Sequence, residues 1–201
     1  MVELDDPTYK ALFSYTRALS VALEFRDAMT QLHSERVRGL AEALGRRCGL
    51  SQQEIGILRI SASFHDIGKV GIPDRVLLKP ERFDDAEWAC MKEHSAIGEK
   101  IIAAIDLEGS GEAALAIRQH HEYFNGRGYP DGLGGDEISL HARIITIVDS
   151  YDAMAETRVY HRAKTHAEIM EILRAESGIK HDPELLQIFC DLIDDSRFRT
   201  G

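Results

Sequence analysis

Cysteine, proline and long apolar runs are all scarce in this chain of 201 residues. The three cysteines, Cys48, Cys90 and Cys190, are isolated and form no C-x-x-C pair, which excludes a disulfide framework and favours a reducing, cytoplasmic setting. No stretch approaches the roughly 18 consecutive apolar residues that a membrane-spanning helix needs. The N-terminal segment MVELDDPTYK also lacks the basic start and apolar run of a secretory signal. We therefore expect a soluble protein without a membrane segment.

The chain also has fewer positive than negative charges. It contains 24 lysines and arginines and 34 acidic residues, which gives a net charge of -10. Duplex nucleic acid is bound by neutralising many phosphates with lysine and arginine, so we expect no duplex nucleic-acid partner. A small anionic substrate stays compatible with this charge, since bound metal ions can dominate the electrostatics of their own site.

Most of the chain predicts helix. Val37, Leu40, Ala41 and Leu44 follow the spacing of one buried helical stripe, and the sequence S-Q-Q-E from Ser51 is a capping box for a helix that should end near residue 68. Residues 125–136 hold five glycines, too many for a helix or a central strand. Further helices are predicted at 8–28, from residue 84 or 85 to 105, and at 112–123, 140–157, 165–177 and 183–194.

The longer predicted helices define the domain organisation. The helix that starts at residue 84 or 85 should place six residues on one face, namely Trp88, Met91, Ser95, Gly98, Ile102 and Ile105. Residues 1–25 are interpreted as a lead-in helix or the stub of a connection, 26–195 as one all-α domain, and 196–201 as a tail. The lead-in helix could pair with a second copy, which makes a homodimer one hypothesis.

Several helices direct a histidine or an aspartate toward the core. His33, His65, His94 and His121 lie three or four residues from buried apolar positions, and Asp149 lies in the most apolar helix. A single inward histidine is usually a satisfied core residue. An unpaired aspartate in an apolar helix costs several kcal/mol or more, so a shared cation is the simplest common explanation.

The candidate ligands outnumber those of a single catalytic metal, which usually takes three protein ligands. Imidazole and carboxylate groups without thiolate suit manganese, iron, nickel, cobalt or catalytic zinc. Two metals about 3.5–4 Å apart could share the Asp66 carboxylate, hold a bridging hydroxide and clamp a phosphoryl oxygen. Lys69, one turn after His65, could reach a phosphate or be a solvated cation. The seven candidate ligands are His33, His65, Asp66, His94, His120, His121 and Asp149.

These residues lie within strings that together resemble an HD-GYP domain, a bacterial branch of the HD phosphohydrolase superfamily. The combination of HD-x-x-GK-x-G-I-P-D with HHE-x-x-x-G-x-GYP is very specific, and the likeness runs from about residue 20 to about residue 190. The strings are HSERV at 33–37, FHDIGKVGIPD at 64–74, LLKPERF at 77–83, MKEHSAIGEKII at 91–102, HHEYFNGRGYPDGLGG at 120–135 and ARIITIVDSYDAM at 142–154.

The resemblance implies an all-α HD-domain helical bundle with a glycine-rich GYP loop, residues 128–130. It implies hydrolysis of cyclic di-GMP to linear pGpG and then to GMP, at a di-iron or di-manganese centre. His33, His65, Asp66 and Asp149 look like the ligands of one metal, with Asp66 bridging. The other metal would be held by His94, His120 and His121.

The resemblance also suggests which residues contact the substrate and partners. Lys69 looks like the phosphate-contacting lysine of the family, and Arg158 like a contact to the second phosphate or to a guanine. Tyr129 of the GYP loop either borders the substrate or packs the loop. The same loop is linked to partner proteins in the family.

Some positions depart from the family pattern. Met29 stands where a three-metal subgroup has glutamate, so we expect two metals. His161 replaces a usual arginine or lysine, and Glu81 replaces a loop glycine. His161 keeps open the alternative of an HD phosphohydrolase that acts on another cyclic dinucleotide or on pGpG, and a non-catalytic receptor or scaffold is a further alternative. The remaining histidines are assigned to the surface or to helix caps: His141, His166 and His181.

Overall fold

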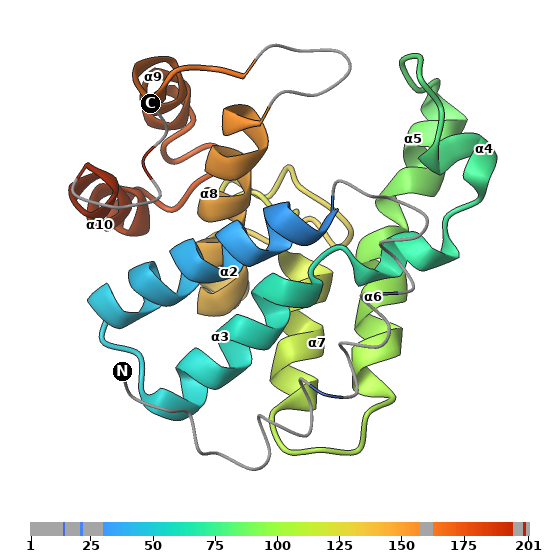
Figure 1. Cartoon of the computed structure of the whole chain (residues 1–201), viewed down its shortest axis with the longest axis horizontal. Helices are drawn as coiled ribbons and strands as arrows, with labels where there is room; N and C mark the ends of the chain where they lie inside the picture. The colour runs from blue at the N-terminus through green and yellow to red at the C-terminus, as the bar shows by residue number, and fades with distance from the viewer. Residues whose placement is uncertain (1–13, 15–20, 22–29, 157–162, 195–198, 200–201) are drawn as a thin grey trace.

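The computed structural model describes residues 14, 21, 30–156, 163–194 and 199. This part of the chain is all-α, as expected, and the residues it describes include no strand beyond two isolated bridges. Figure 1 shows α9 and α10 gathered at one end of the molecule and α4 and α5 at the other. The helices are α2 (Thr30–Arg47), α3 (Gln52–Phe64), α4 (Asp74–Leu77), α5 (Asp85–Lys92), α6 (His94–Ala103), α7 (Ser110–Gln119), α8 (Leu140–Ala155), α9 (His166–Ala175) and α10 (Pro183–Ile193), with 3-10 turns η1 (Ile67–Gly71) and η2 (Gly135–Glu137).

The predicted boundary between α2 and α3 is confirmed. α2 ends at Arg47, and Gly49 follows with a φ of 80°, a left-handed conformation that glycine adopts without steric cost. Ser51 caps α3 through a capping box with Glu54. α3 ends at Phe64, four residues earlier than predicted, because the chain tightens into η1. The shorter helix leaves His65 at its C-cap, where the site begins.

Two hydrophobic clusters hold the helices together. The first joins α2, α8, α9 and α10 around side chains such as Leu40, Ile145 and Phe189, and the second joins α6 and α7 around Ile102 and Ile117. α3 contributes to both clusters, since it packs against α2 on one side and α7 on the other. Each fully buried leucine, isoleucine or phenylalanine stabilises the fold by about 1.5–3 kcal/mol. The end of α3 is therefore fixed between two cores.

The single helix predicted from residue 84 or 85 to residue 105 is wrong. The structure has two helices, α5 and α6, separated by a turn at Glu93. The Met91 carbonyl accepts a bond from the His94 ring at 2.8 Å, which competes with the regular helical pattern. Trp88, predicted on the buried face with residues of α6, is 46% exposed.

The surface assignment of the remaining histidines holds only in part. His141 and His166 are half-buried, whereas His181 is buried at 1% exposure and its Nε2 lies 3.1 Å from Glu176 Oε2. His181 lies in a turn just before the N-cap of α10, and a turn has no hydrophobic period that would mark a buried position.

The predicted lead-in helix at 8–28 lies outside the described residues, apart from residues 14 and 21. Among the helices that are described, none has the length and hydropathy needed to cross a membrane.

Candidate metal centre

The candidate ligands come together as two groups of three. Within each group the possible ligand atoms lie within 4.8 Å of one another. Helices α2 and α8 and the C-cap of α3 supply one group, while the other comes from the start of α6 and the two residues that follow α7. Elements distant in the sequence therefore converge at one place. The groups are His33, His65 and Asp149, and His94, His120 and His121.

Asp66 lies between the two groups. Its Oδ2 is 3.6 Å from His65 Nε2, and its Oδ1 is 3.5 Å from His94 Nε2. The two oxygens of one carboxylate thus face different groups. This arrangement is compatible with a bridging carboxylate, and the bridging function expected of Asp66 stays a prediction.

Three of the imidazoles are oriented by the backbone one turn before them. The Nδ1 atoms of His65, His94 and His120 lie 2.9, 2.8 and 2.6 Å from carbonyl oxygens three residues earlier. A carbonyl can only accept, so each Nδ1 carries the proton and each Nε2 keeps its lone pair. This tautomer leaves Nε2 ready to bind a metal, and such outer partners usually orient metal-binding histidines.

His33 is oriented by side chains instead. Its Nδ1 lies 2.7 Å from Asp152 Oδ2, and its Nε2 lies 3.1 Å from Asp149 Oδ1. Arg36 donates to both oxygens of Asp152 at 2.7 and 2.9 Å, and to Glu156 at 2.7 Å. The sequence analysis missed Asp152 and Arg36. A signal was present, because Asp152 follows Asp149 by three residues and therefore lies on the same side of α8.

The donors fit a divalent cation. His65 Nε2 is buried and has no hydrogen-bond partner among the described residues. A buried polar atom without a partner costs about 1–3 kcal/mol, and a metal ion at this point would remove that cost. Nitrogen and carboxylate donors without thiolate suit manganese, iron or catalytic zinc.

Electrostatics differ between the two groups. Burial disfavours the charged form of His33, but hydrogen bonds to Asp149 and Asp152 outweigh it and raise its pKa to about 10. Burial also opposes charge on Asp149, yet His33 and His65 hold the pKa of this carboxyl well below its usual range. In the other group burial, reinforced by neighbouring imidazoles, lowers the pKa of His120 to about 3 and that of His121 well below its ordinary value. The shifts favour the charged forms of His33 and Asp149, which pair with each other, and the neutral forms of His120 and His121.

Lys69 lies at the edge of the centre, where its Nζ donates to Asp66 Oδ2 at 2.7 Å. Burial alone would raise the pKa of Asp66, but Lys69 and the nearby imidazoles hold it well below its ordinary value. Glycine at position 68 allows Lys69 to lie at this position, because a Cβ at Gly68 would lie 1.8 Å from the carbonyl oxygen of His94. η1 can therefore pack directly on α6 only with glycine at this position.

The GYP loop packs against the second group. Tyr129 stacks on His121 with ring centroids 4.7 Å apart, and its amide donates to the His121 carbonyl at 3.1 Å. Gly128 permits this approach, because a Cβ there would lie 2.2 Å from the Tyr123 nitrogen. Both interpretations of Tyr129 are compatible with this position, since it packs the loop and lies beside a candidate ligand.

Glu122 organises the loop from within, a contribution that the sequence analysis missed. The side chain is 1% exposed, and its two oxygens accept the backbone amides of Asp131, Gly132 and Leu133 at 2.6, 3.0 and 3.1 Å. An acidic residue directly after two metal-ligating candidates gave no spacing signal of its own. Its function depends on a loop that folds back over it.

Three positions named from the sequence lie outside the described residues: Met29, Arg158 and His161. The expected metal count from Met29 and the expected substrate contact of Arg158 therefore stay predictions.

Comparison with known protein families gives a match over the part of the chain that contains these residues. A family model described as HD domain matches residues 17–185. The chain belongs to the HD domain family. A solved structure from Bdellovibrio bacteriovorus, described as an HDG"Y"P protein, shares this fold with a TM-score of 0.65 and 21% identity, covering 94% of this chain and 62% of that chain. The all-α HD bundle and the HD-GYP resemblance are both confirmed.

Curated relatives match over most of the chain. The chain is 38% identical over 165 residues to the cyclic di-GMP phosphodiesterase response regulator RpfG of Xanthomonas campestris, covering 82% of this chain and 44% of the relative. It is 33% identical over 195 residues to 3'3'-cGAMP-specific phosphodiesterase 2 of Vibrio cholerae, covering 97% of this chain and 37% of the relative. The chain thus spans less than half the length of these HD-family proteins.

Proposed function

We propose that this HD domain catalyses metal-dependent hydrolysis of cyclic di-GMP to pGpG, with further cleavage to GMP. The observation that carries the proposal is the pairing of two three-residue groups through the two oxygens of Asp66. The identity to cyclic-dinucleotide phosphodiesterases supports it, over 82% of the chain for one relative and 97% for the other.

His33, His65, Asp66 and Asp149 would hold one cation, and the other would be held by His94, His120 and His121 with Asp66 shared. Two divalent cations here would supply an activated water and neutralise charge that develops on the phosphate. The protein's own part is orientation, since backbone carbonyls and Asp152 keep the imidazole Nε2 atoms directed inward.

Lys69 would donate to a non-bridging phosphate oxygen. The Lys69 ammonium already lies 2.7 Å from Asp66 Oδ2. A small rotation of this flexible side chain would bring it to a phosphate that is bound by the two cations sharing Asp66. Tyr129 would border the substrate through its stacked position on His121. Arg158 is proposed, from the family motif alone, to contact the second phosphate or a guanine.

Iron or manganese is the proposed metal, because the donors are imidazole and carboxylate and the family uses such centres. The GYP loop is proposed as a surface for a protein partner, supported by the exposed Trp88 ring 6.0 Å from Tyr129. A homodimer through residues 8–28 stays a prediction that sedimentation velocity checks directly.

A product assay tests the proposed reaction. The protein is purified without oxygen in the presence of Fe(II) or Mn(II), the metal content is measured, and cyclic di-GMP is added. We expect pGpG to appear by chromatography and mass spectrometry, followed by GMP. Absence of product with either metal, at two metal ions per chain, would exclude the reaction and favour the alternative of a nucleotide receptor or scaffold.

A second candidate substrate is a hybrid cyclic dinucleotide. The observation that favours it is the identity of 33% to a 3'3'-cGAMP-specific phosphodiesterase over 97% of the chain. Competition between cyclic di-GMP, 3'3'-cGAMP and pGpG in one reaction measures the preference.

A further inference from the structure

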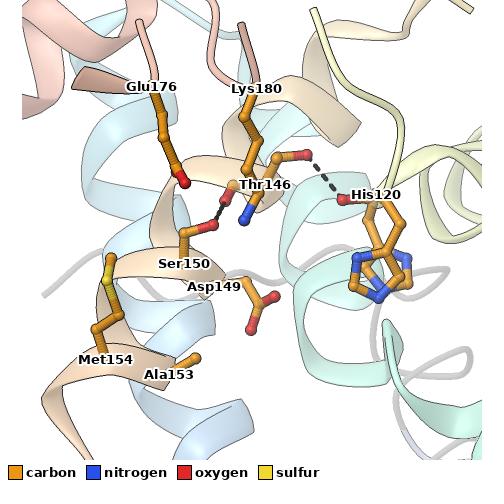
Figure 2. Close-up of a pocket in the computed structure, with 9 residues that line it drawn as sticks. His120, Thr146, Asp149, Ser150, Ala153, Met154, Glu176 and Lys180 are labelled. Atoms are coloured by element: carbon orange, nitrogen blue, oxygen red, sulfur yellow. Dashed lines mark hydrogen bonds between the residues drawn. The ribbon is translucent and has the colours of Figure 1, made fainter. Parts of the chain in front are cut away.

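A cavity of about 180 Å³ opens beside the metal centre, between α8 and the segment that follows α9. His121 and Asp149 line it on the side of the centre, and Ser150 lines it from α8. Glu176 and Lys180 close the opposite side. Figure 2 shows both side chains extending toward α8. Pockets for drug-sized ligands measure about 300–1,000 Å³, so this cavity suits one part of a dinucleotide rather than the whole molecule.

The backbone holds Glu176 and Lys180 in place. The Lys180 amide donates to the Glu176 carbonyl at 2.9 Å, which closes a turn after α9. The Lys180 carbonyl accepts the Phe124 amide at 3.2 Å, so the turn is also tied to the segment that leads into the GYP loop. Both side chains therefore start from a fixed backbone, which lowers the entropy cost of binding a ligand.

The two side chains have polar capacity left for a ligand. Glu176 Oε2 lies 3.1 Å from the buried His181 Nε2, while no hydrogen bond to Oε1 is recorded within residues 30–156 and 163–194. The Lys180 ammonium lies 5.8 Å from the centre of the Tyr123 ring, and the same described ranges contain no ion pair to it. An ionised carboxylate only accepts and each of its oxygens has two lone pairs, so Glu176 offers acceptor sites on Oε1 and a remaining one on Oε2, while the Lys180 ammonium offers donors.

This combination selects among the parts of a nucleotide. A second phosphate would meet the negative charge of Glu176, which disfavours it. A guanine edge carries two neighbouring N–H donors, N1 and N2, beside the O6 acceptor, whereas adenine carries an acceptor at N1. We propose that Glu176 accepts from N1–H and N2–H of a guanine base and that Lys180 donates to its O6. This inference rests on the proposed cyclic-dinucleotide substrate and adds its base specificity.

Both candidate substrates would be recognised through one guanine base. Cyclic di-GMP and 3'3'-cGAMP each carry at least one guanine, so each can fill the cavity while a phosphate lies on the metal centre. Cyclic di-AMP offers no guanine and would leave the Glu176 carboxylate facing an acceptor. Two acceptors that face each other repel, because neither supplies a proton to the other.

Binding of mononucleotides tests the inference without turnover. The manganese-loaded protein is titrated calorimetrically with GMP and with AMP. We expect GMP to bind at least about 10-fold more tightly, and Glu176→Gln to abolish that preference while AMP binding stays the same. Lys180→Met should weaken GMP binding by about 5-fold or more. The matched control is Glu171→Gln, an exposed carboxylate on α9 outside the cavity, which should keep the preference.

The outcomes separate this inference from the proposed reaction. Equal binding of GMP and AMP by the wild-type protein, or an unchanged preference in Glu176→Gln with an unchanged melting temperature, overturns the inference even if cyclic di-GMP is hydrolysed. A Glu176-dependent preference for GMP supports it even if no cyclic dinucleotide is cleaved. If Glu176→Gln lowers the melting temperature, GMP binding by Lys180→Met decides instead, and unchanged GMP binding by that variant overturns the inference.

Discussion

The His33–His65–Asp149 group and the His94–His120–His121 group offer equal numbers of ligands but differ in charge. In the first, the His33 ring lies 3.1 Å from the Asp149 carboxylate, and the two charges compensate one another. In the second, three imidazoles crowd together, with His120 and His121 ring centroids 3.9 Å apart, and burial keeps them neutral. The His33–Asp149 pair can be satisfied without metal, whereas His65 Nε2 in the same group is buried without a hydrogen-bond partner among the described residues and would be satisfied by a cation.

The outer partners differ in the same way. Backbone carbonyls orient His94 and His120 of the second group and also His65 of the first. A chain of charged side chains, Asp152 and Arg36, orients His33. A substitution at Asp152 can therefore remove the support of His33, whereas no side-chain substitution removes the backbone carbonyls behind His65, His94 and His120.

The largest expected effect joins the two groups. Asp66→Ala removes the carboxylate that faces both, so we expect loss of both metal ions and of measurable turnover. Elemental analysis and the pGpG assay read out the two losses separately. The control is Asp85→Ala, an exposed acidic residue in the first turn of α5. Retention of two metals by Asp66→Ala would show that the groups bind independently.

Removing Lys69 should leave both groups intact. Its ammonium contacts Asp66 but cannot ligate a metal while protonated, so Lys69→Ala should keep two metals per chain. Loss of one charged donor to the reacting phosphate should lower kcat by about 100-fold. Exposed Lys100 on α6 gives the matched alanine control. A fall in metal content would instead assign Lys69 to maintenance of the centre.

The Asp152→Asn substitution distinguishes the groups. It weakens the support of His33 Nδ1 and leaves the carbonyls behind His94 and His120 untouched. We expect the affinity of one metal to fall by about 10-fold and that of the other to stay unchanged, as measured by competition with a chelating dye. Asp191→Asn, on the exposed face of α10, serves as the control. Equal weakening of both metals would remove the asymmetry.

The smallest effect concerns a buried histidine outside the centre. Burial lowers the pKa of His181 to about 3, so the folded protein keeps it neutral below the ordinary value of about 6.5. The unfolded chain binds the proton first, and stability is therefore lost as pH falls from about 6.5 toward 3. Between pH 7.5 and 5.5 this loss is about 1.4 kcal/mol.

Urea unfolding at the two pH values measures the difference between the wild-type protein and His181→Gln. The wild-type protein should lose more stability than the variant by that amount. Identical pH dependence of the two would show that the Glu176 carboxylate compensates the charge on His181.

Helical spacing predicted that the candidate histidines and Asp149 converge, because it reports which side of a helix a residue occupies, and their function as metal ligands stays a prediction. Val37 and Leu40 mark the buried side of α2, and His33 continues it. The support of His33 by Asp152 and Arg36 was not predicted, because the contact between these two residues joins α2 to α8 across 116 residues of sequence. The helix break at Glu93 was not predicted, because it depends on a hydrogen bond from the His94 side chain. The cavity lined by Glu176 and Lys180 was not predicted either, because its walls meet only after tertiary packing.

The central claim is a pair of metals joined by one carboxylate. Electron paramagnetic resonance of the manganese-loaded protein, with the metal-to-protein ratio measured on the same sample, tests it most directly. We predict two manganese ions per chain with an exchange-coupled signal, replaced in Asp66→Ala by the loss of bound metal. One ion per chain, or two ions with the six-line signal of isolated manganese, would contradict the account.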